Sequence, residues 1–303
     1  MKSDLERLTN YSKQLFDKFY KLYENEDQRN LFHVGLGSFV DKRVAPASSE
    51  NDAFRENPCL TDASYRDQCE PNYVFRNNLP LKHRNSASFV EELTSIQKKF
   101  SSNADFNEAG LDALIQAAIC HDEVNWRCTQ SDATCTQPTR KMIVYMSDAG
   151  FHVQGDGRVS SLFQRHDEKC HLDMNNAEIE GDQFDYPSMG QTAQIINDAS
   201  LMVAFTISNN NNSNIEHIKT SYDDLSAMIT TSKVVVVDDT VKNEDAADQI
   251  FELFKDLAYR AVLRLPELSS EYDLVVKKVV VRDDHNRVVE SQCTYTCKNI
   301  EPG

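Results

Sequence analysis

The sequence has 303 residues, enough for one large domain or for one domain and part of a second. Its formal net charge of −16 argues against nucleic acid or an anionic membrane surface as the main partner. No stretch approaches the roughly 18 apolar residues that span a bilayer, and the polar start Met-Lys-Ser-Asp predicts no signal peptide. Taken alone, these features would place the chain in the cytosol.

The first third of the chain combines helical patterns, one strand and a long polar region. Apolar residues at helical spacing predict a helix over 4–24, and residues 30–41 are typical of a strand. The polar stretch from about 42 to 87 predicts a long loop, used either for partner recognition or as a surface insertion held by a disulfide. Helices are expected at about 88–100 and 110–119.

Buried strands and helices alternate over the following residues. The strands are continuous apolar runs, at 141–147, 201–208 and 233–239. A helix is expected after Pro187-Ser188, and another at about 246–262. This alternation predicts an α/β fold with a doubly wound, mostly parallel sheet and helices on both faces.

The character of the sequence changes after Pro266. Residues 273–282 and 288–297 are typical of β-strands with no helix between them, so we expect one domain over 1–263 and the start of a β-rich domain over 264–303. The chain begins with a helix, whereas a doubly wound sheet normally builds its central strand first. We therefore expect the first domain to lack its first strand and the chain to be truncated.

Asp148 lies at the end of the strand expected over 141–147. In open α/β sheets, ligands bind beyond the carboxyl ends of the strands, and a carboxylate there is costly to desolvate unless it is paired or bound to a cation. The alternative is an ordinary loop or N-cap aspartate. Asp148 is therefore a candidate metal ligand.

A second acidic cluster occupies residues 103–108. It offers oxygen-bearing side chains at Asn103, Asp105, Asn107 and Glu108, which suit a hard cation better than a transition metal. The spacing is not that of an EF-hand, and the alternative is capping of the helix that follows. Together with Asp148, this cluster predicts a divalent-metal site at the ligand-binding edge of the sheet.

The eight cysteines argue against a cytosolic location. Their number is even and their local spacing suits disulfides in an oxidising compartment. The expected pairs are Cys59–Cys69, Cys120–Cys170 and Cys128–Cys135; Cys293 and Cys297 are also close in sequence, but the sequence leaves their pairing open. Zinc is the alternative, because histidines follow Cys120 and Cys170, but no C-x-x-C or H-x-x-x-H spacing supports it. Two sequons, at Asn10 and Asn211, are compatible with secretion.

Several short motifs resemble the integrin β-subunit and occur in the order found in that family. They are Gly35-Leu-Gly37, Phe39-Val-Asp-Lys42, Asn57-Pro-Cys59, Trp126-Arg127, Ser147-Asp-Ala149, Gly155-Asp-Gly157, Cys170-His171 and Asp185-Tyr-Pro-Ser188. The resemblance covers about 1–262 as the I-like, von Willebrand A-type domain, and the remaining residues as the resumption of the hybrid domain. It implies a cell-adhesion receptor chain rather than an enzyme.

The resemblance also implies the cations and their ligands. In the family, Mg²⁺ (with Mn²⁺ as a substitute) is held by a D-x-S-x-S motif, a glutamate and a distant aspartate. Glu108 and Asp148 occupy the last two positions, whereas the D-x-S-x-S motif would precede Met1. An acidic side chain of the ligand would complete the coordination of the ion.

Two flanking Ca²⁺ sites are implied as well. One would use side chains at Asp41, Asn103, Asp105 and Glu108 and the carbonyl of Asn107, where the family usually has proline. The other normally uses two consecutive aspartates; here those positions are Ser3 and Asp4, so this site has lost one carboxylate.

The implied partners are an integrin α-subunit and a matrix or cell-surface ligand that presents an acidic residue. The implied location is the outside of a plasma-membrane receptor that takes part in integrin-mediated signalling, with no direct membrane contact by this segment. The loop of Cys59 and Cys69 resembles the family's specificity-determining loop, and residues 127–139 form an insertion beyond the usual length.

Two alternatives compete with a cation-dependent adhesion receptor. One is a truncated integrin-like product that binds no ligand. The other is a nucleotide or metal enzyme on a doubly wound fold, but Gly35-Leu-Gly37 is the only candidate glycine loop, and no Walker loop or G-x-S-x-G elbow is present.

Overall fold

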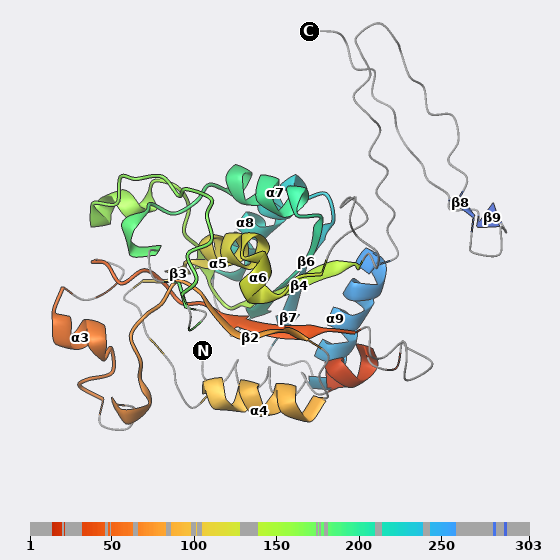
Figure 1. Cartoon of the computed structure of the whole chain (residues 1–303), viewed down its shortest axis with the longest axis horizontal. Helices are drawn as coiled ribbons and strands as arrows, with labels where there is room; N and C mark the ends of the chain where they lie inside the picture. Colours follow the sequence, from red (N-terminus) through yellow and green to blue (C-terminus); the bar gives the residue numbers. More distant parts are fainter. Residues whose placement is uncertain are drawn as a thin grey trace, which may run out of the picture. The chain divides into compact units, whose positions relative to one another are not determined.

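Figure 1 shows the computed structural model of the chain. The structure describes residues 14–19, 21, 32–45, 48, 50–62, 66–82, 86–97, 101, 105–127, 139–173, 175, 177–178, 181–209, 214–238, 243–258, 281–282 and 288–289. The chain divides into two compact units, Met1–Val262 and Leu263–Gly303.

The centre of the first unit is a parallel three-stranded sheet in the order β4-β6-β7. Its strands are β4 (Lys141–Ser147), β6 (Leu201–Asn209) and β7 (Ser232–Asp238). These bounds lie within one residue of the expected ones. The middle strand β6 is almost entirely buried, as expected for a parallel strand covered on both faces.

Helices cover both faces of this sheet, so the expected doubly wound α/β fold is confirmed. On one face, Val203, Phe205 and Ile207 of β6 join a core with side chains of α5 (Gly110–Ile119), α7 (Met189–Asp198) and α8 (Ile215–Met228). On the other face, the alternate β6 residues Met202 and Ala204 pack with α9 (Asn243–Ala258).

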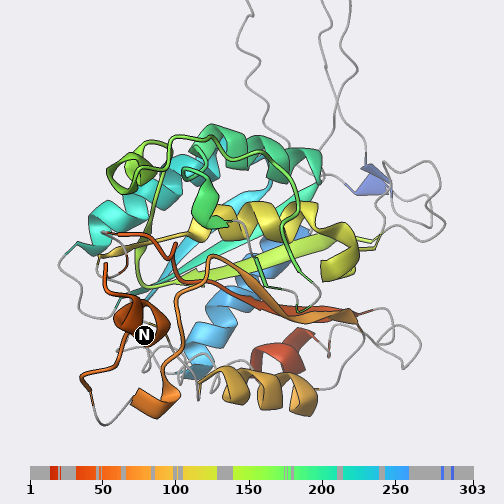
Figure 2. The same cartoon turned by 60° about the vertical axis from the view of Figure 1, so that its left-hand side comes forward.

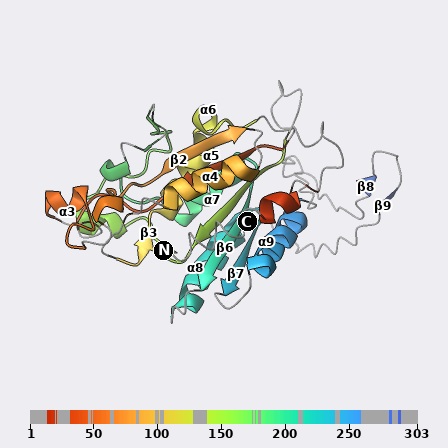
Figure 3. The same ribbon diagram turned by 90° about the horizontal axis from the view of Figure 1, so that it is seen from below.

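Residues near the start of the chain also pack on the second face of the sheet. Residues 14–19 are helical, and Leu15 and Phe19 pack with Ala247 and Ile250 of α9. Figures 2 and 3 show this short red helix beside the blue α9 and near α4 (Ser86–Gln97). The rest of the helix expected over 4–24 lies outside the described residues, apart from residue 21.

Two of the longer elements were not expected from the sequence. The first is β2 (Arg76–Lys82), which pairs antiparallel with β1 (Val34–Ser38) inside the region expected to be a long loop. Its sequence Arg-Asn-Asn-Leu-Pro-Leu-Lys has a proline and little apolar alternation, which hides a strand. The same region contains α3 (Asp52–Glu56) and the 3₁₀ turn η1 (Arg66–Gln68).

The second missed element is α8, between the strands at 201–209 and 232–238. Its buried residues Tyr222 and Leu225 have helical spacing, but the polar residues around them obscure the pattern. Short elements complete the unit: β3 (Asn107–Glu108), β5 (Gly150–Phe151), α6 (His121–Val124), η2 (Asp156–Ser160) and η3 (Gly181–Gln183).

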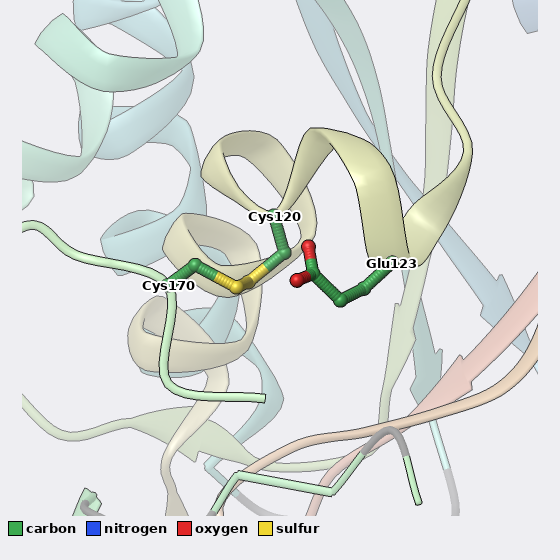
Figure 4. Close-up of side chains that lie close together, drawn as sticks. All are labelled: Cys120, Glu123 and Cys170. Atoms are coloured by element: carbon green, nitrogen blue, oxygen red, sulfur yellow. A yellow bond between two sulfur atoms is a disulfide. The ribbon is translucent and has the colours of Figure 1, made fainter. Parts of the chain in front are cut away.

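Two of the expected disulfides are present, Cys59–Cys69 and Cys120–Cys170. Figure 4 shows the second, with the carboxylate of Glu123 close to the sulfur atoms. Because both sulfurs are joined to each other, neither is a thiolate that could bind zinc. Cys128, Cys135, Cys293 and Cys297, together with the sequons at Asn10 and Asn211, lie outside the described residues.

In the second unit, the structure describes β8 (Val281–Arg282) and β9 (Val288–Val289), which pair antiparallel. Each falls in a segment expected to be a strand. Among the described residues, no helix combines the length and apolar character needed to cross a membrane.

Candidate metal centre

Asp148 follows the last residue of β4, at the carboxyl end of the parallel sheet. The turn is held on both sides: the backbone N–H of Ala149 donates to Ser147 Oγ at 3.1 Å, and the hydroxyl of Tyr222 donates to the Ala149 carbonyl at 3.1 Å. Tyr222 is itself fully buried in the core. The position of Asp148 is therefore fixed by the sheet and by α8, as expected for a ligand-binding edge.

Glu108 is held beside this turn by the parallel pairing of β3 with β5. The Glu108 carbonyl accepts a hydrogen bond from the backbone N–H of His152 at 3.0 Å, and Ala109 donates to the carbonyl of Val40 at 2.8 Å. The side chain of Glu108 is buried. The N-cap of α5 is Ala109, which makes no side-chain capping bond, so no acidic residue occupies the N-cap position of this helix.

Gly110 allows α5 to begin close to β4. A β-carbon at this position would lie 1.9 Å from the hydroxyl oxygen of Tyr145. Tyr145 is buried, and its ring stacks on Phe39 with 5.2 Å between the ring centroids. The close approach brings the cluster that precedes α5 to the end of β4.

Asp41 lies just beyond β1 and is completely buried. Its Oδ1 accepts a hydrogen bond from the hydroxyl of Tyr186 at 2.7 Å. Its Oδ2 has no hydrogen-bond partner among the described residues and lies 3.6 Å from His152 Nε2. A buried carboxylate oxygen without a partner is costly, so this atom is suited to a cation.

His152 joins the acidic groups, although no motif in the sequence marks it as a site residue. Its Nε2 lies 3.0 Å from Asp105 Oδ2, and its Nδ1 lies 3.1 Å from Asp156 Oδ2. The ring stacks on Tyr186 at a centroid distance of 4.3 Å. Burial opposes the charge of His152, but the hydrogen bond to Asp105 and the nearby carboxylate of Asp41 outweigh it and raise the pKa of His152 to about 10.

The electrostatics of Glu108 show that this site has an excess of negative charge. Burial, followed by the nearby carboxylates of Asp41, Asp148 and Asp105, raises the pKa of Glu108 to about 9. Like charges can raise a pKa in this way only when they lie close together. The four carboxylates expected from separate parts of the sequence are therefore brought into one region.

This donor set fits a hard divalent cation. Mg²⁺ and Ca²⁺ prefer carboxylate and carbonyl oxygens, and a bound cation would offset the repulsion that raises the pKa of Glu108. Asp41, Asp105 and His152 also place one ligand atom each within 4.8 Å of one another. Asn107 is in the same loop, and its Oδ1 would lie 2.5 Å from a β-carbon at Gly150. Asn103, Ser3 and Asp4 lie outside the described residues.

The motif Asp185-Tyr186 holds two parts of the site in place through hydrogen bonds. The carboxylate of Asp185 accepts hydrogen bonds from the backbone N–H groups of Gly155 and Gly157 at 2.8 and 2.9 Å. Gly155 has φ of 110°, a conformation that glycine adopts without strain. Asp185 thus holds the turn that presents Asp156 to His152, while Tyr186 holds Asp41.

A buried ion pair lies next to the site. Lys42 Nζ donates to Asp112 Oδ1 at 2.8 Å and to the Gly181 carbonyl at 2.7 Å, and the side chains of Lys42 and Asp112 are completely buried. The Lys42 ammonium also lies 4.7 Å from the ring centroid of Tyr186. The pair anchors the segment that carries Asp41 to α5.

A further group of ionisable side chains does not have the character of a metal site. Asp112, His166 and Glu178 place ligand atoms within 4.8 Å of one another. However, His166 Nδ1 accepts a hydrogen bond from the backbone N–H of Glu168 at 3.1 Å. Burial lowers the pKa of His166, so the ring is neutral and its Nε2 carries the proton. That nitrogen is a hydrogen-bond donor, not a lone pair for a metal.

The fold and the site define a von Willebrand A-type domain with a carboxylate cluster at the carboxyl edge of its sheet. The profile of the integrin β-chain VWA domain matches residues 1–262, and the chain therefore belongs to the integrin β-chain family. Integrin β chains are subunits of adhesion receptors and not enzymes, which removes the enzymatic alternative.

Individual integrin β chains support this assignment. The chain is 33% identical to integrin beta-5 of Bos taurus over 210 residues, which cover 69% of this chain and 24% of the relative. It is 28% identical to integrin beta-1 of Gallus gallus over 277 residues, covering 91% and 30%. It is 32% identical to integrin beta-PS of Drosophila melanogaster over 212 residues, covering 67% and 23%. The matched part of the chain thus spans between 23% and 30% of the length of these relatives.

Proposed function

We propose that this chain contributes a divalent-cation site that binds an acidic side chain of a ligand, as part of an αβ adhesion receptor at the cell surface. The observation that carries the proposal is the environment of Glu108, a buried carboxylate surrounded by Asp41, Asp105 and Asp148. Such a cluster holds more negative charge than the one nearby histidine can balance. A cation supplies the missing charge, and a carboxylate from a ligand can then bind to that cation.

The proposed division of roles follows the family resemblance. Glu108 and Asp148 would hold Mg²⁺, with Mn²⁺ as a substitute, and ligand would bind there. Asp41, Asp105, Glu108 and the carbonyl of Asn107 would hold a flanking Ca²⁺ together with Asn103. The weakened second flanking site would use Ser3 and Asp4.

The proposed partners are an integrin α-subunit and a matrix or cell-surface protein that presents an acidic residue. The receptor would signal across the plasma membrane, with this segment on the outside and the two sequons glycosylated. Residues 264–303 would begin the hybrid domain, and Cys128 would pair with Cys135. Family membership and the even number of cysteines support these roles.

The proposal is tested in the full-length receptor expressed with its α-subunit on cells. Glu108→Ala and Asp148→Ala should each abolish Mg²⁺-dependent adhesion and leave surface expression unchanged. Asp223→Ala is the matched control, because Asp223 is a partly exposed aspartate that pairs with Lys219 on α8. Undiminished adhesion in both site variants would overturn the proposal. The alternative of an integrin-like product that binds no ligand predicts instead that the receptor shows no Mg²⁺-dependent adhesion even before mutation.

A further inference from the structure

Phe106 is an exposed aromatic residue inside the candidate cation-binding loop. Its relative exposure is 90%, the highest among the four large apolar residues that the described part of the chain exposes. Single exposed apolar residues are common on protein surfaces and need no explanation by themselves. Phe106 differs because candidate ligands, Asp105 and Asn107, flank it on both sides.

The backbone on either side of Phe106 is fixed. Asp105 Oδ2 lies 3.0 Å from His152 Nε2, and Asn107 and Glu108 pair with β5. Phe106 is thus held outward on a loop whose neighbours are already ordered. An aromatic side chain in such a setting loses little conformational freedom when it contacts a partner.

The distance along the chain suits contact with a ligand that binds at the cation. Phe106 precedes Glu108 by two residues, which is about 7 Å in an extended chain. Neighbouring residues of a ligand are about 3.8 Å apart at their Cα atoms. A ligand whose acidic side chain binds a cation held by Glu108 can therefore bring an adjacent side chain to the Phe106 ring.

We infer that Phe106 is a specificity-determining residue that selects ligands with an apolar residue next to the acidic one. The inference rests on the proposed function, because it requires the acidic residue to bind at the cation site. A phenylalanine ring exposes a large apolar surface, and a polar neighbour in the ligand would lose its own hydration against this surface without gaining a hydrogen bond. The class of ligand is therefore an acidic residue flanked by aliphatic or aromatic residues.

The test compares two peptides on the soluble αβ ectodomain in Mg²⁺. The peptides are Gly-Leu-Asp-Leu-Gly and Gly-Ser-Asp-Ser-Gly, each labelled for fluorescence polarisation. The wild-type receptor should bind the leucine peptide about 10-fold more tightly, which corresponds to ~1.4 kcal/mol at 25 °C. Phe106→Ser should reduce this preference to less than about twofold, through weaker binding of the leucine peptide.

Phe163→Ala is the matched control, because Phe163 is also an exposed phenylalanine, at 74%, but lies outside the cation-binding loop. It should leave the preference intact. A preference that survives Phe106→Ser would overturn the inference, as would loss of α-subunit pairing in that variant, because Phe106 would then contact the α-subunit. Glu108→Gln separates the two proposals: it should abolish binding of both peptides, and retained binding would refute the cation site itself.

Discussion

If the proposed site binds Mg²⁺, Glu108 should make the affinity for this ion strongly dependent on pH. Its pKa is raised to about 9, so it is protonated at neutral pH in the metal-free protein, and a cation must displace that proton. Between pH 6 and pH 8 the deprotonated fraction of such a group rises about 100-fold. The apparent Mg²⁺ affinity should rise by the same factor, which equals ~2.7 kcal/mol. A carboxylate with an ordinary pKa would be ionised throughout this range and would give almost no change.

Isothermal titration calorimetry measures both parts of this prediction. Mg²⁺ titrations at pH 6, 7 and 8 give the affinity, and titrations at pH 7 in buffers of different ionisation enthalpy give the number of protons released, expected to be about one. In Glu108→Gln the proton release should disappear. An affinity that is constant between pH 6 and pH 8, or no proton release at pH 7, would refute the assignment of Glu108 as a buried, protonated ligand.

The same shifts determine how the stability of the metal-free protein depends on pH. The folded-state pKa values of Glu108 and His152 both lie above their ordinary values of 4.5 and 6.5. A raised pKa contributes stability that is complete below the ordinary value and is lost as the pH rises through the folded-state value. The melting temperature without Mg²⁺ should therefore fall between about pH 5 and pH 10, and saturating Mg²⁺ should reduce the fall.

Three substitutions test the framework around the site. Gly110→Ala would place a β-carbon 1.9 Å from the Tyr145 hydroxyl and should destabilise the fold by about 1–3 kcal/mol in chemical denaturation; unchanged stability would show that α5 moves freely. Tyr186→Phe removes the hydrogen bond to the buried Asp41 and should lower stability by ~1.5–3 kcal/mol without Ca²⁺, with a smaller loss at saturating Ca²⁺. Cys120→Ser opens a disulfide with a sequence separation of 50 and should lower stability by about 4 kcal/mol, so a loss below 1 kcal/mol would contradict the loop-closure argument.

The parts of the fold with strong periodicity were predictable from the sequence. The runs around Tyr145, Phe205 and Val236 are apolar and bounded by polar residues, and each forms a strand of the parallel sheet. The elements that were missed have weak local signals. The strand at Arg76–Lys82 depends on pairing with Val34–Ser38, which is distant in the sequence, and its proline argues against a strand in any local analysis.

The site was predictable only where its chemistry is local. Asp148 is recognisable because a carboxylate ends an apolar run, and Glu108 because several oxygen-bearing residues cluster beside it. His152 gives no such signal, since one histidine after a strand has many possible roles. His152 follows Asp148 by four residues, but this spacing alone does not mark a site residue. Only the structure shows Asp105 and Asp156 against its two ring nitrogens.

The structure gives a physical reason for the order of motifs that marks the family. The aspartate of Phe39-Val-Asp-Lys42 is a buried site carboxylate, and its lysine forms the buried pair with Asp112. The turn Gly155-Asp-Gly157 presents an aspartate to His152, and Asp185-Tyr-Pro-Ser188 supplies both the acceptor for that turn and the tyrosine that binds Asp41. These motifs are far apart in the sequence but form one hydrogen-bonded support for the edge that we propose binds a cation. A substitution in any of them should therefore affect cation binding even when the residue touches no ion.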